Sequence, residues 1–220
     1  MSKKILMVVT SANQINSEKS TGLWLSEFAE PYIEFTKEGY NITVASPLGG
    51  KTPVDQNSLS ADLPQEIVDA QKYLANTIKL DEIIASDYDV IFLPGGHGTM
   101  FDLPDNEKLQ SLLSQFYEND KIVAAVCHGP AGLVNAKLSN GKYLVEGKRI
   151  TAFTDSEEKA AGLDQYMPFL LESKLREAGP IFVTAADWSD HYEVDGNLIT
   201  GQNPQSTLSV AKEIIAKLQA

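Results

Sequence analysis

Short runs of β-branched and other apolar residues alternate along this chain with longer stretches of helical periodicity. Several of the short runs are apolar at consecutive positions, as in parallel strands that are covered on both faces. The predicted strands are Ile5–Thr10, Asn41–Ala45, Val90–Leu93, Ile122–Val126, Ile181–Thr184 and Leu198–Thr200. The predicted helices are the stretch from Leu23 to Phe35, with Ser20 or Thr21 as its N-cap, then Asn106–Tyr117 and Pro204–Leu218. This alternation predicts an α/β fold with a doubly wound, mostly parallel sheet sandwiched by helices.

Two segments interrupt the alternation. Residues 46–89 are too long for a simple crossover, and they contain a Gly- and Pro-bearing loop followed by helical patterns near Gln65–Ala75 and Leu80–Ala85. Ser156–Ala178 also adds helix between strands. Neither segment has a linker-like boundary, so we expect residues 1–220 to form a single domain. The insertion at about 46–89 is then a small helical cap that could wall a pocket.

The charge balance disfavours some classes of function. The chain has 18 Lys and Arg against 30 Asp and Glu, a net charge of −12. Such a field repels phosphate backbones and anionic lipids, so we expect no nucleic-acid partner and no membrane partner. The apolar run from Ile5 to Val9 is too short for a signal peptide. The single cysteine cannot form an internal disulfide, which is typical of a reducing cytoplasm.

The single cysteine, Cys127, is the main candidate for chemistry. It follows the strand Ile122–Val126 and precedes Gly129-Pro130, which indicates the opening of a helix. Such a strand-to-helix turn exposes a nucleophile at the carboxyl edge of the sheet and places backbone N–H groups near a developing oxyanion. A helix N-terminus also favours the thiolate. The alternative is a buried cysteine acting as a small apolar side chain, and the turn favours the nucleophile.

A glycine-rich loop follows the neighbouring predicted strand. Gly95-Gly96-His97-Gly98 permits close backbone approach, but it does not match a dinucleotide-binding fingerprint. We therefore expect this loop, rather than a phosphate site, to supply an oxyanion donor near Cys127. The alternative is a plain turn. The candidate oxyanion and substrate-binding residues are Gly95, Gly96, His97 and Gly129.

Acid–base partners for Cys127 are less constrained by the sequence. His128 is adjacent, but neighbouring side chains rarely point the same way, so it could face the pocket from the side and need an orienting carboxylate. Either Glu157 or Glu158 could supply that carboxylate, and both could equally be solvated. Glu27 lies in an otherwise apolar helix and is either functional or a surface residue. His97 and His191 are expected as structural or rim residues, and no zinc-motif spacing is present, so we expect no metal.

Four segments of this chain resemble the ThiJ/PfpI superfamily, which shares a flavodoxin-like sandwich with class I glutamine amidotransferases. They are Pro94-Gly95-Gly96-His97-Gly98 with Phe101-Asp102, Ala124-Ala125-Val126-Cys127-His128-Gly129-Pro130, the run Thr151–Glu158, and the run Asp195–Pro204. With the first strand and helix they span nearly the whole chain.

Within that superfamily the chain is similar to the glutathione-independent glyoxalases (glyoxalase III type) and heat-inducible chaperones. The resemblance places the histidine-orienting acid on Glu158 and the glutamate of the first helix on Glu27. It implies that Cys127 attacks methylglyoxal, that His128 moves a proton between two substrate carbons, and that lactate is released without a cofactor. Glu27 should then have a raised pKa, because a charged carboxylate disfavours the thiolate.

Other functions fit the same resemblance. A stress-inducible holding chaperone that binds unfolded proteins, or a sensor in which Cys127 is oxidised, is the main alternative. A cysteine peptidase, a deglycase and an amidotransferase are less favoured. Amidotransferases normally carry Gly where this chain has Ala125, and the downstream His191-Tyr192-Glu193 only superficially matches their His-x-Glu. Superfamily members are commonly dimers, so the resemblance also implies a homodimer.

Overall fold

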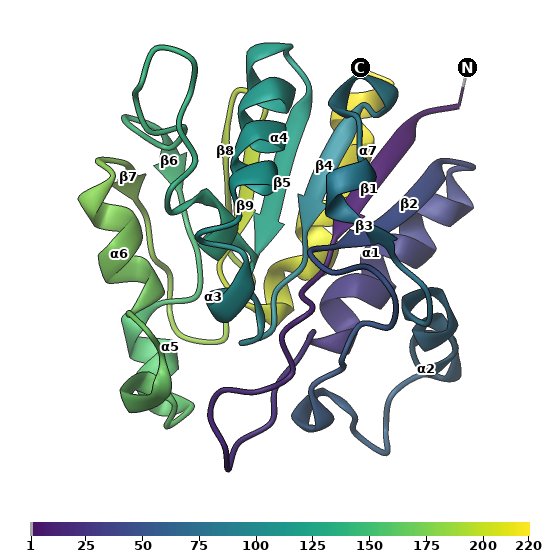
Figure 1. Ribbon diagram of the computed structural model, residues 1–220, viewed down its shortest axis with the longest axis vertical. Coiled ribbons are helices and arrows are strands. Elements are labelled where there is room, and N and C mark those ends of the chain that lie inside the picture. Colours follow the sequence, from purple (N-terminus) through teal and green to yellow (C-terminus); the bar gives the residue numbers. More distant parts are fainter. Residues whose placement is uncertain (1) are drawn as a thin grey trace.

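A seven-stranded sheet runs through the centre of the computed structural model, which describes residues 2–220 (Figure 1). The strand order is β3-β2-β1-β4-β5-β9-β8, and every neighbouring pair is parallel except β8 with β9. The strands are β1 (Lys4–Val8), β2 (Asn41–Ser46), β3 (Ile78–Lys79), β4 (Val90–Leu93), β5 (Ile122–Val126), β8 (Tyr192–Asp195) and β9 (Leu198–Gly201). The predicted doubly wound, mostly parallel sheet is confirmed. The order β2-β1-β4-β5-β9 is the flavodoxin-like order, in which the switch point lies between β1 and β4.

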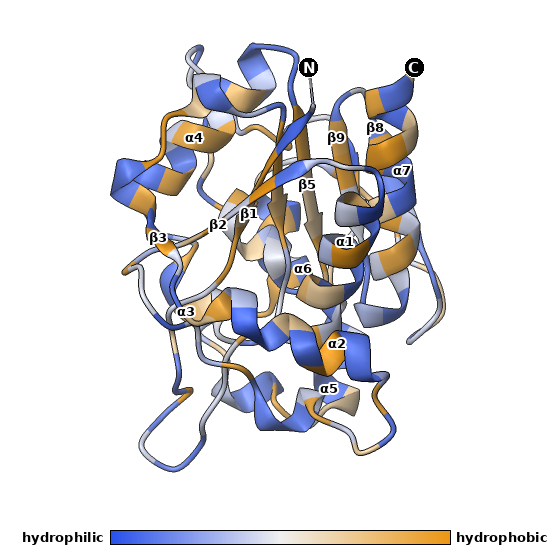
Figure 2. Ribbon diagram, turned by 90° about the vertical axis from the view of Figure 1, so that its right-hand side faces the viewer, coloured by the Kyte–Doolittle hydropathy of each residue, from blue (hydrophilic) through white to orange (hydrophobic). Residues whose placement is uncertain are grey.

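Helices cover both faces of this sheet. Helices α1 and α7 pack together on one face, and α4 covers the other (Figure 2). The helices are α1 (Leu25–Lys37), α2 (Gln65–Asp69), α3 (Thr99–Asp102), α4 (Glu107–Glu118), α5 (Asp155–Ala160), α6 (Leu171–Glu177) and α7 (Thr207–Gln219). Short 3₁₀ turns occur at Gln56–Ser58, Ala70–Leu74, Leu80–Glu82, Ala85–Asp87, Gly129–Leu133, Asp164–Tyr166 and Pro204–Ser206.

Burial on both faces explains why the central strands are apolar at consecutive positions. Every residue of β4 and β5 is buried, and Figure 2 shows the hydrophobic interior between helices whose outer surfaces are hydrophilic. Phe28 and Phe35 of α1 and Phe116 of α4 are fully buried against this sheet. Each such side chain contributes about 1.5–3 kcal/mol of transfer free energy. The core therefore fixes β4 and β5, whose carboxyl ends lead into the two loops singled out in the sequence.

One predicted strand lies outside the main sheet. Residues Ile181–Phe182 form β7, which pairs only with β6 (Arg149–Ile150) in a separate two-stranded sheet. The prediction of a longer strand to Thr184 was wrong, because pairing ends once Val183 donates to the carbonyl of Ile150. Strands β3, β6 and β8 were not predicted. β3 and β8 lie at the sheet edges, where exposure removes the apolar pattern.

The entry to α1 differs from the prediction. The helix begins at Leu25 after Trp24, whose side chain makes no capping hydrogen bond. Thr21, a predicted N-cap, instead donates from its hydroxyl to Asp55 Oδ2 over 3.2 Å. Leu23 exchanges backbone hydrogen bonds with Pro53 and Asp55, each 2.9 Å long. The cap prediction was wrong because this segment is held in an extended conformation by the insertion.

The insertion at 46–89 contributes α2 and several 3₁₀ turns, as well as the edge strand β3. The second predicted helix, near Leu80–Ala85, is wrong. Those residues form two separate 3₁₀ turns, in which Leu80, Ile83 and Ala85 are buried against the core while Ile84 is exposed. Across residues 2–220, we find no helix with both the length and the apolar character needed to span a membrane.

Candidate active site

The carboxyl ends of β4 and β5 bring the glycine-rich loop and the Cys127 turn to one edge of the sheet, at the lower side of Figure 1. Leu93 lies directly beside Ala125 in the parallel ladder, so the residues that follow them emerge together. Helix α1 begins at the same edge, after the long loop that leaves β1. In open α/β sheets, ligands bind at this edge.

Cys127 occupies a strained turn directly after β5. Its φ of 59° is in the left-handed region, which side-chain-bearing residues rarely adopt. The turn is held by two hydrogen bonds, from the Cys127 amide to the Gly201 carbonyl over 3.0 Å and from the Phe153 amide to the Cys127 carbonyl over 2.9 Å. The neighbouring strand and the segment before α5 therefore fix the sulfur in place. This geometry is typical of a nucleophile elbow.

The expected helix N-terminus behind Cys127 is absent from the described structure. Gly129–Leu133 forms only a 3₁₀ turn, which has too few aligned peptides to act as a helix dipole. Burial raises the pKa of Cys127 well above its ordinary value, and the Glu27 carboxyl adds to this rise, although the His128 amide opposes it. The expectation that the turn favours the thiolate was therefore wrong. The resting group is the thiol.

Glu27 is fully buried beside this thiol. Its Oε2 atom accepts a 2.6 Å hydrogen bond from the Gly95 amide, and its Oε1 atom has no partner among the described residues. Burial raises the pKa of Glu27 to about 8, and the neighbouring Cys127 thiol and Gly95 amide offset this only in part. Glu27 is therefore a neutral acid near pH 7, poised to exchange a proton with its surroundings.

The candidate glycines serve two different purposes, close packing of the backbone and donation of an amide hydrogen. The Gly95 amide is already donated to Glu27, so it cannot serve as an oxyanion donor, contrary to expectation. A Cβ on Gly95 would lie 2.7 Å from both Glu27 Oε2 and the His128 amide, and one on Gly129 would lie 2.0 Å from the Leu93 carbonyl. These two glycines allow close packing. The amides of Gly96, His97, His128 and Gly129 donate no backbone hydrogen bond in the described chain, so they remain candidate donors for an oxyanion, and the His128 amide already acts on the Cys127 sulfur.

Glu158 joins two histidines. Its Oε2 atom lies 2.6 Å from His128 Nε2, and its Oε1 atom lies 2.7 Å from His97 Nε2. Both histidines are buried, with ring centroids 4.1 Å apart, so His97 is not a rim residue. Burial raises the pKa of Glu158, but the two imidazoles lower it further, so that its pKa is about 2. Burial lowers the pKa of His128 to about 4, so its imidazole is neutral at pH 7.

His128 also reaches the sulfur. Its Nδ1 atom lies 3.4 Å from Cys127 Sγ, while Nε2 faces Glu158. The adjacent residues can share one direction because the left-handed backbone at Cys127 turns its side chain toward the following imidazole. An anionic Glu158 requires the proton on Nε2, so Nδ1 is free to accept the thiol proton.

The neighbouring carboxylate, Glu157, faces elsewhere. It completes a capping box with Thr154 at the start of α5, and its Oε1 atom accepts hydrogen bonds from the Trp188 amide (2.9 Å), Gln202 (3.1 Å) and Asn203 (2.8 Å). Of the two alternatives left open by the sequence, only Glu158 contacts the histidines.

A cavity of about 90 Å³ opens above Cys127. Three aromatic side chains line it, those of Trp24, Phe153 and Trp188. Its polar lining consists of Glu27, His97, Cys127 and His128. Trp188 has a φ of 61° and packs edge-on against Phe153 at 5.6 Å between ring centroids. The sequence analysis assigned no role in the site to Trp24, Phe153 or Trp188. Phe153 lies within the matched run Thr151–Glu158, which was the available signal for it.

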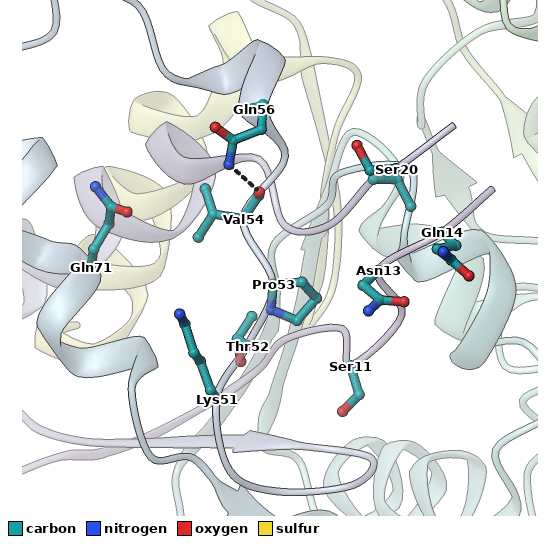
Figure 3. A pocket seen from close by; sticks show the side chains of 11 residues that line it. Ser11, Asn13, Gln14, Ser20, Lys51, Thr52, Pro53, Val54, Gln56 and Gln71 are labelled. Atoms are coloured by element: carbon teal, nitrogen blue, oxygen red, sulfur yellow. Dashed lines mark hydrogen bonds between the residues drawn. The ribbon is translucent and has the colours of Figure 1, made fainter. Parts of the chain in front are cut away.

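A second, larger cavity lies apart from this chemistry. It has a volume of about 590 Å³ and is lined by loop residues that include Asn13, Lys51 and Gln71 (Figure 3). No cysteine, histidine or carboxylate lines it. The only described group with the composition of a metal site is His97, His128 and Glu158, whose ligand atoms lie within 4.8 Å of one another. Hydrogen bonding between these groups accounts for that arrangement, and the absence of a metal stays a prediction.

Several known proteins are similar to this chain in sequence and in fold. The profile of the DJ-1/PfpI family matches residues 20–217. A glutathione-independent glyoxalase of Saccharomyces cerevisiae, HSP31, is 35% identical over 99% of this chain and 98% of its own length. Glyoxalase III of Candida albicans has a crystal structure with a TM-score of 0.90, 32% identity, and coverage of 97% of this chain and 96% of that one. Rapid Encystment Protein 24 KDa of Francisella tularensis superposes with a TM-score of 0.94 at 37% identity, covering 98% and 99% of the two chains.

Proposed function

This chain belongs to the DJ-1/PfpI family, and from that membership we propose that it is a glutathione-independent glyoxalase that converts methylglyoxal and water to lactate. The full-length similarity to two glyoxalases supports the reaction. The observation that carries the assignment to this site is the continuous contact from Cys127 through His128 to Glu158, with a neutral Glu27 on the other side of the thiol.

The first step is addition of the Cys127 sulfur to the aldehyde carbon. His128 Nδ1 accepts the thiol proton as the carbon–sulfur bond forms, because its other nitrogen is held as a donor by Glu158. The aldehyde oxygen becomes an oxyanion, which the amides of Gly96 and His128 stabilise and which Glu27 protonates. The product of this step is a hemithioacetal.

The second step moves hydrogen between the two carbons. His128 passes the thiol proton to the Glu27 carboxylate, which restores both groups, and its Nδ1 atom then removes the proton from the former aldehyde carbon to give an enediol. The adjacent carbon is then protonated. The first carbon is thereby oxidised to a thioester and the second is reduced to an alcohol, so no external oxidant or reductant is needed. Water then attacks the thioester, the carbon–sulfur bond breaks, and the Cys127 thiol is regenerated as lactate leaves. The aromatic walls restrict the cavity to a small 2-oxoaldehyde.

The test is lactate formation from methylglyoxal without glutathione or added metal. Wild type should be active, and Cys127→Ala should lose all activity above background while keeping its fold. A well-folded wild type that forms no lactate would contradict the proposal. His191→Asn is a matched control, because His191 does not line the cavity.

Three further expectations belong to this proposal. A reducing cytoplasm is the proposed compartment, because the reaction requires Cys127 as a free thiol; compartment-resolved labelling of the native protein tests it. A homodimer is tested by sedimentation. Holding of unfolded proteins is tested by aggregation suppression that survives Cys127→Ala. A redox-sensor role is less favoured, because the raised pKa of Cys127 leaves little reactive thiolate.

A further inference from the structure

His97 makes a contact that the steps above do not use. It shares Glu158 with His128, each imidazole donating to a different carboxylate oxygen, over 2.7 Å from His97 and 2.6 Å from His128. His97 lies 61 positions from Glu158 in the sequence, and the glycine-rich loop after β4 places it there. The side chains of all three residues are less than one-tenth exposed.

The shared carboxylate fixes the protons on both rings. An ionised Glu158 has no hydrogen to donate, so each Nε2 atom must carry one. The pKa of Glu158, about 2, keeps it ionised throughout the neutral range. Each ring therefore has its Nε2 hydrogen fixed by Glu158, and Nδ1 is the nitrogen at which each ring can exchange a proton.

The two Nδ1 atoms have different surroundings. His128 Nδ1 contacts the sulfur at 3.4 Å. His97 Nδ1 has no hydrogen-bond partner in the described chain, and it is not among the buried polar atoms that lack one, so it is accessible. The His97 ring lines the same cavity as Cys127. Two imidazoles held by one carboxylate thus line the cavity, and only His128 contacts the thiol through its Nδ1 atom.

The reaction needs proton transfer at more than one place. The thiol loses a proton, the first carbon loses one, and the second carbon gains one. We propose that His97 is a second acid–base residue, which exchanges a proton at the ketone end of the bound 2-oxoaldehyde while His128 serves the sulfur and the aldehyde carbon. This inference rests on the proposed glyoxalase function. His97 Nδ1 first takes up a proton from solvent in the cavity while Nε2 stays bonded to Glu158. It then donates that proton to the second carbon of the enediol, which restores the unprotonated Nδ1.

Glu158 couples the two bases. When His128 takes up a proton at Nδ1, its imidazolium is stabilised by the carboxylate, and the same carboxylate holds the opposite nitrogen of His97 as a donor. One buried charge therefore supports a protonated state on either ring, but not readily on both, since the rings are 4.1 Å apart. Protonation that alternates between His128 and His97 suits the transfer of hydrogen between the two adjacent carbons of the substrate.

The experiment compares wild type with His97→Asn, His97→Gln and the control His191→Asn. Three quantities are measured: kcat for methylglyoxal, the rate at which iodoacetamide alkylates Cys127, and the deuterium isotope effect with substrate labelled at the aldehyde carbon. We expect kcat to fall by about 100-fold or more in both His97 variants, as for loss of a general acid–base group. Alkylation should stay within about twofold of wild type, because His128 still serves the sulfur. The isotope effect should fall toward one, because protonation of the second carbon becomes rate-limiting.

A structural role for His97 gives a different pattern. If His97 only positions Glu158 and His128, alkylation of Cys127 slows together with kcat and the isotope effect does not fall, and the inference is overturned. It is equally overturned if either His97 variant keeps kcat within about threefold of wild type. Thermal unfolding identifies a His97 variant that has lost its fold. In that case the other His97 variant, if folded, decides between a proton-transfer role and a structural role. An inactive wild type contradicts the proposed function itself and this inference with it, whereas active wild type with active His97 variants contradicts the inference alone.

Discussion

The Gly95 amide donates a 2.6 Å hydrogen bond to the Glu27 carboxyl, and this contact joins the glycine-rich loop after β4 to helix α1 directly beneath the nucleophile. A side chain at position 95 would collide with the same carboxyl oxygen, at 2.7 Å. The loop therefore leaves Glu27 buried, and burial is the largest cause of its raised pKa.

Glu27→Gln should separate thiol acidity from catalysis. The charge of Glu27 and its hydrogen bond raise the pKa of Cys127, so removing the charge lowers it. We expect Cys127 to be alkylated faster in the variant than in wild type above pH 8, where Glu27 ionises. Activity toward methylglyoxal should nevertheless fall by about 100-fold or more, because Gln cannot exchange a proton. Parallel loss of alkylation and activity would contradict the assigned role.

The stability of the protein should fall as the pH rises through the range set by Glu27. Its pKa is 4.5 when unfolded and about 8 when folded, so between these values the folded state binds one more proton. Unfolding free energy then decreases with pH by up to about 1.4 kcal/mol per unit, or about 4–5 kcal/mol over the range. Asp102, whose pKa burial raises to about 6, acts in the same direction up to that pH.

Denaturant unfolding of wild type and Glu27→Gln at pH 5.5 and 8.5 measures this contribution. His128 and Glu158 have lowered pKa values and oppose the trend at acidic pH, but they are present in both proteins and cancel in the difference. The stability of Glu27→Gln relative to wild type should increase by about 3 kcal/mol between the two pH values. An unchanged difference would show that Glu27 titrates normally in the folded protein.

Glu157 and Glu158 are adjacent acids, but changing each to Gln should affect different properties. We expect the change at Glu158 to lower mainly kcat and the change at Glu157 to lower mainly stability. Glu158→Gln loses the acceptor of two imidazole protons, so we expect kcat to fall by about 100-fold or more with a smaller effect on folding. Glu157→Gln disturbs a buried carboxylate with five donors from α5, the Trp188 loop and the segment after β9. We expect it to lose about 2–4 kcal/mol of stability.

Thermal unfolding and kcat of the folded fraction distinguish the two variants. Each serves as the matched control of the other, since they are neighbours on one helix and undergo the same chemical change. If Glu157→Gln lost kcat while Glu158→Gln kept it, the assignment of Glu158 as the partner of His128 would be wrong.

The parts of the fold that could be predicted are those determined by local sequence. The strands Val90–Leu93 and Ile122–Val126 were placed to the residue, because each is a continuous apolar run that follows a charged residue and is ended by Pro94 or by the turn at Cys127. The two-residue strand β3 has no such pattern, since its side chains are exposed and only its backbone pairs. The α1 entry was misplaced because Asp55 takes the Thr21 hydroxyl, a contact that sequence spacing does not reveal.

In the candidate site, too, the features set by local sequence could be predicted and those set by contacts between distant segments could not. The position of Cys127 on a turn after β5 follows from the strand pattern and the glycines after it. Its protonation state does not, because that depends on burial under Glu27 from a different element. The choice between Glu157 and Glu158 likewise depends on which side of a short helix meets His128, and local spacing left both open. His97 was predicted as a structural or rim residue and as a candidate for substrate binding, and nothing near it in sequence shows that its partner is Glu158.

Trp188 should control the size of substrate that the cavity accepts. It lines the cavity together with Trp24, and it packs on Phe153 from a strained backbone with a φ of 61°. Trp188→Gly removes the indole and also relieves that strain, because glycine adopts positive φ without cost. We expect kcat/KM for phenylglyoxal to rise by about 10-fold or more relative to that for methylglyoxal, while alkylation of Cys127 changes little.

The control for this change is Tyr192→Gly, which removes an exposed aromatic residue outside the cavity. It should leave the ratio of the two substrates unchanged. An unchanged ratio in Trp188→Gly would show that the indole does not limit substrate size, and that Trp24 and Phe153 set the limit instead. Equal loss of activity toward both substrates would show that Trp188 acts on the shared chemistry, through the Glu157 contact that holds its backbone over the site.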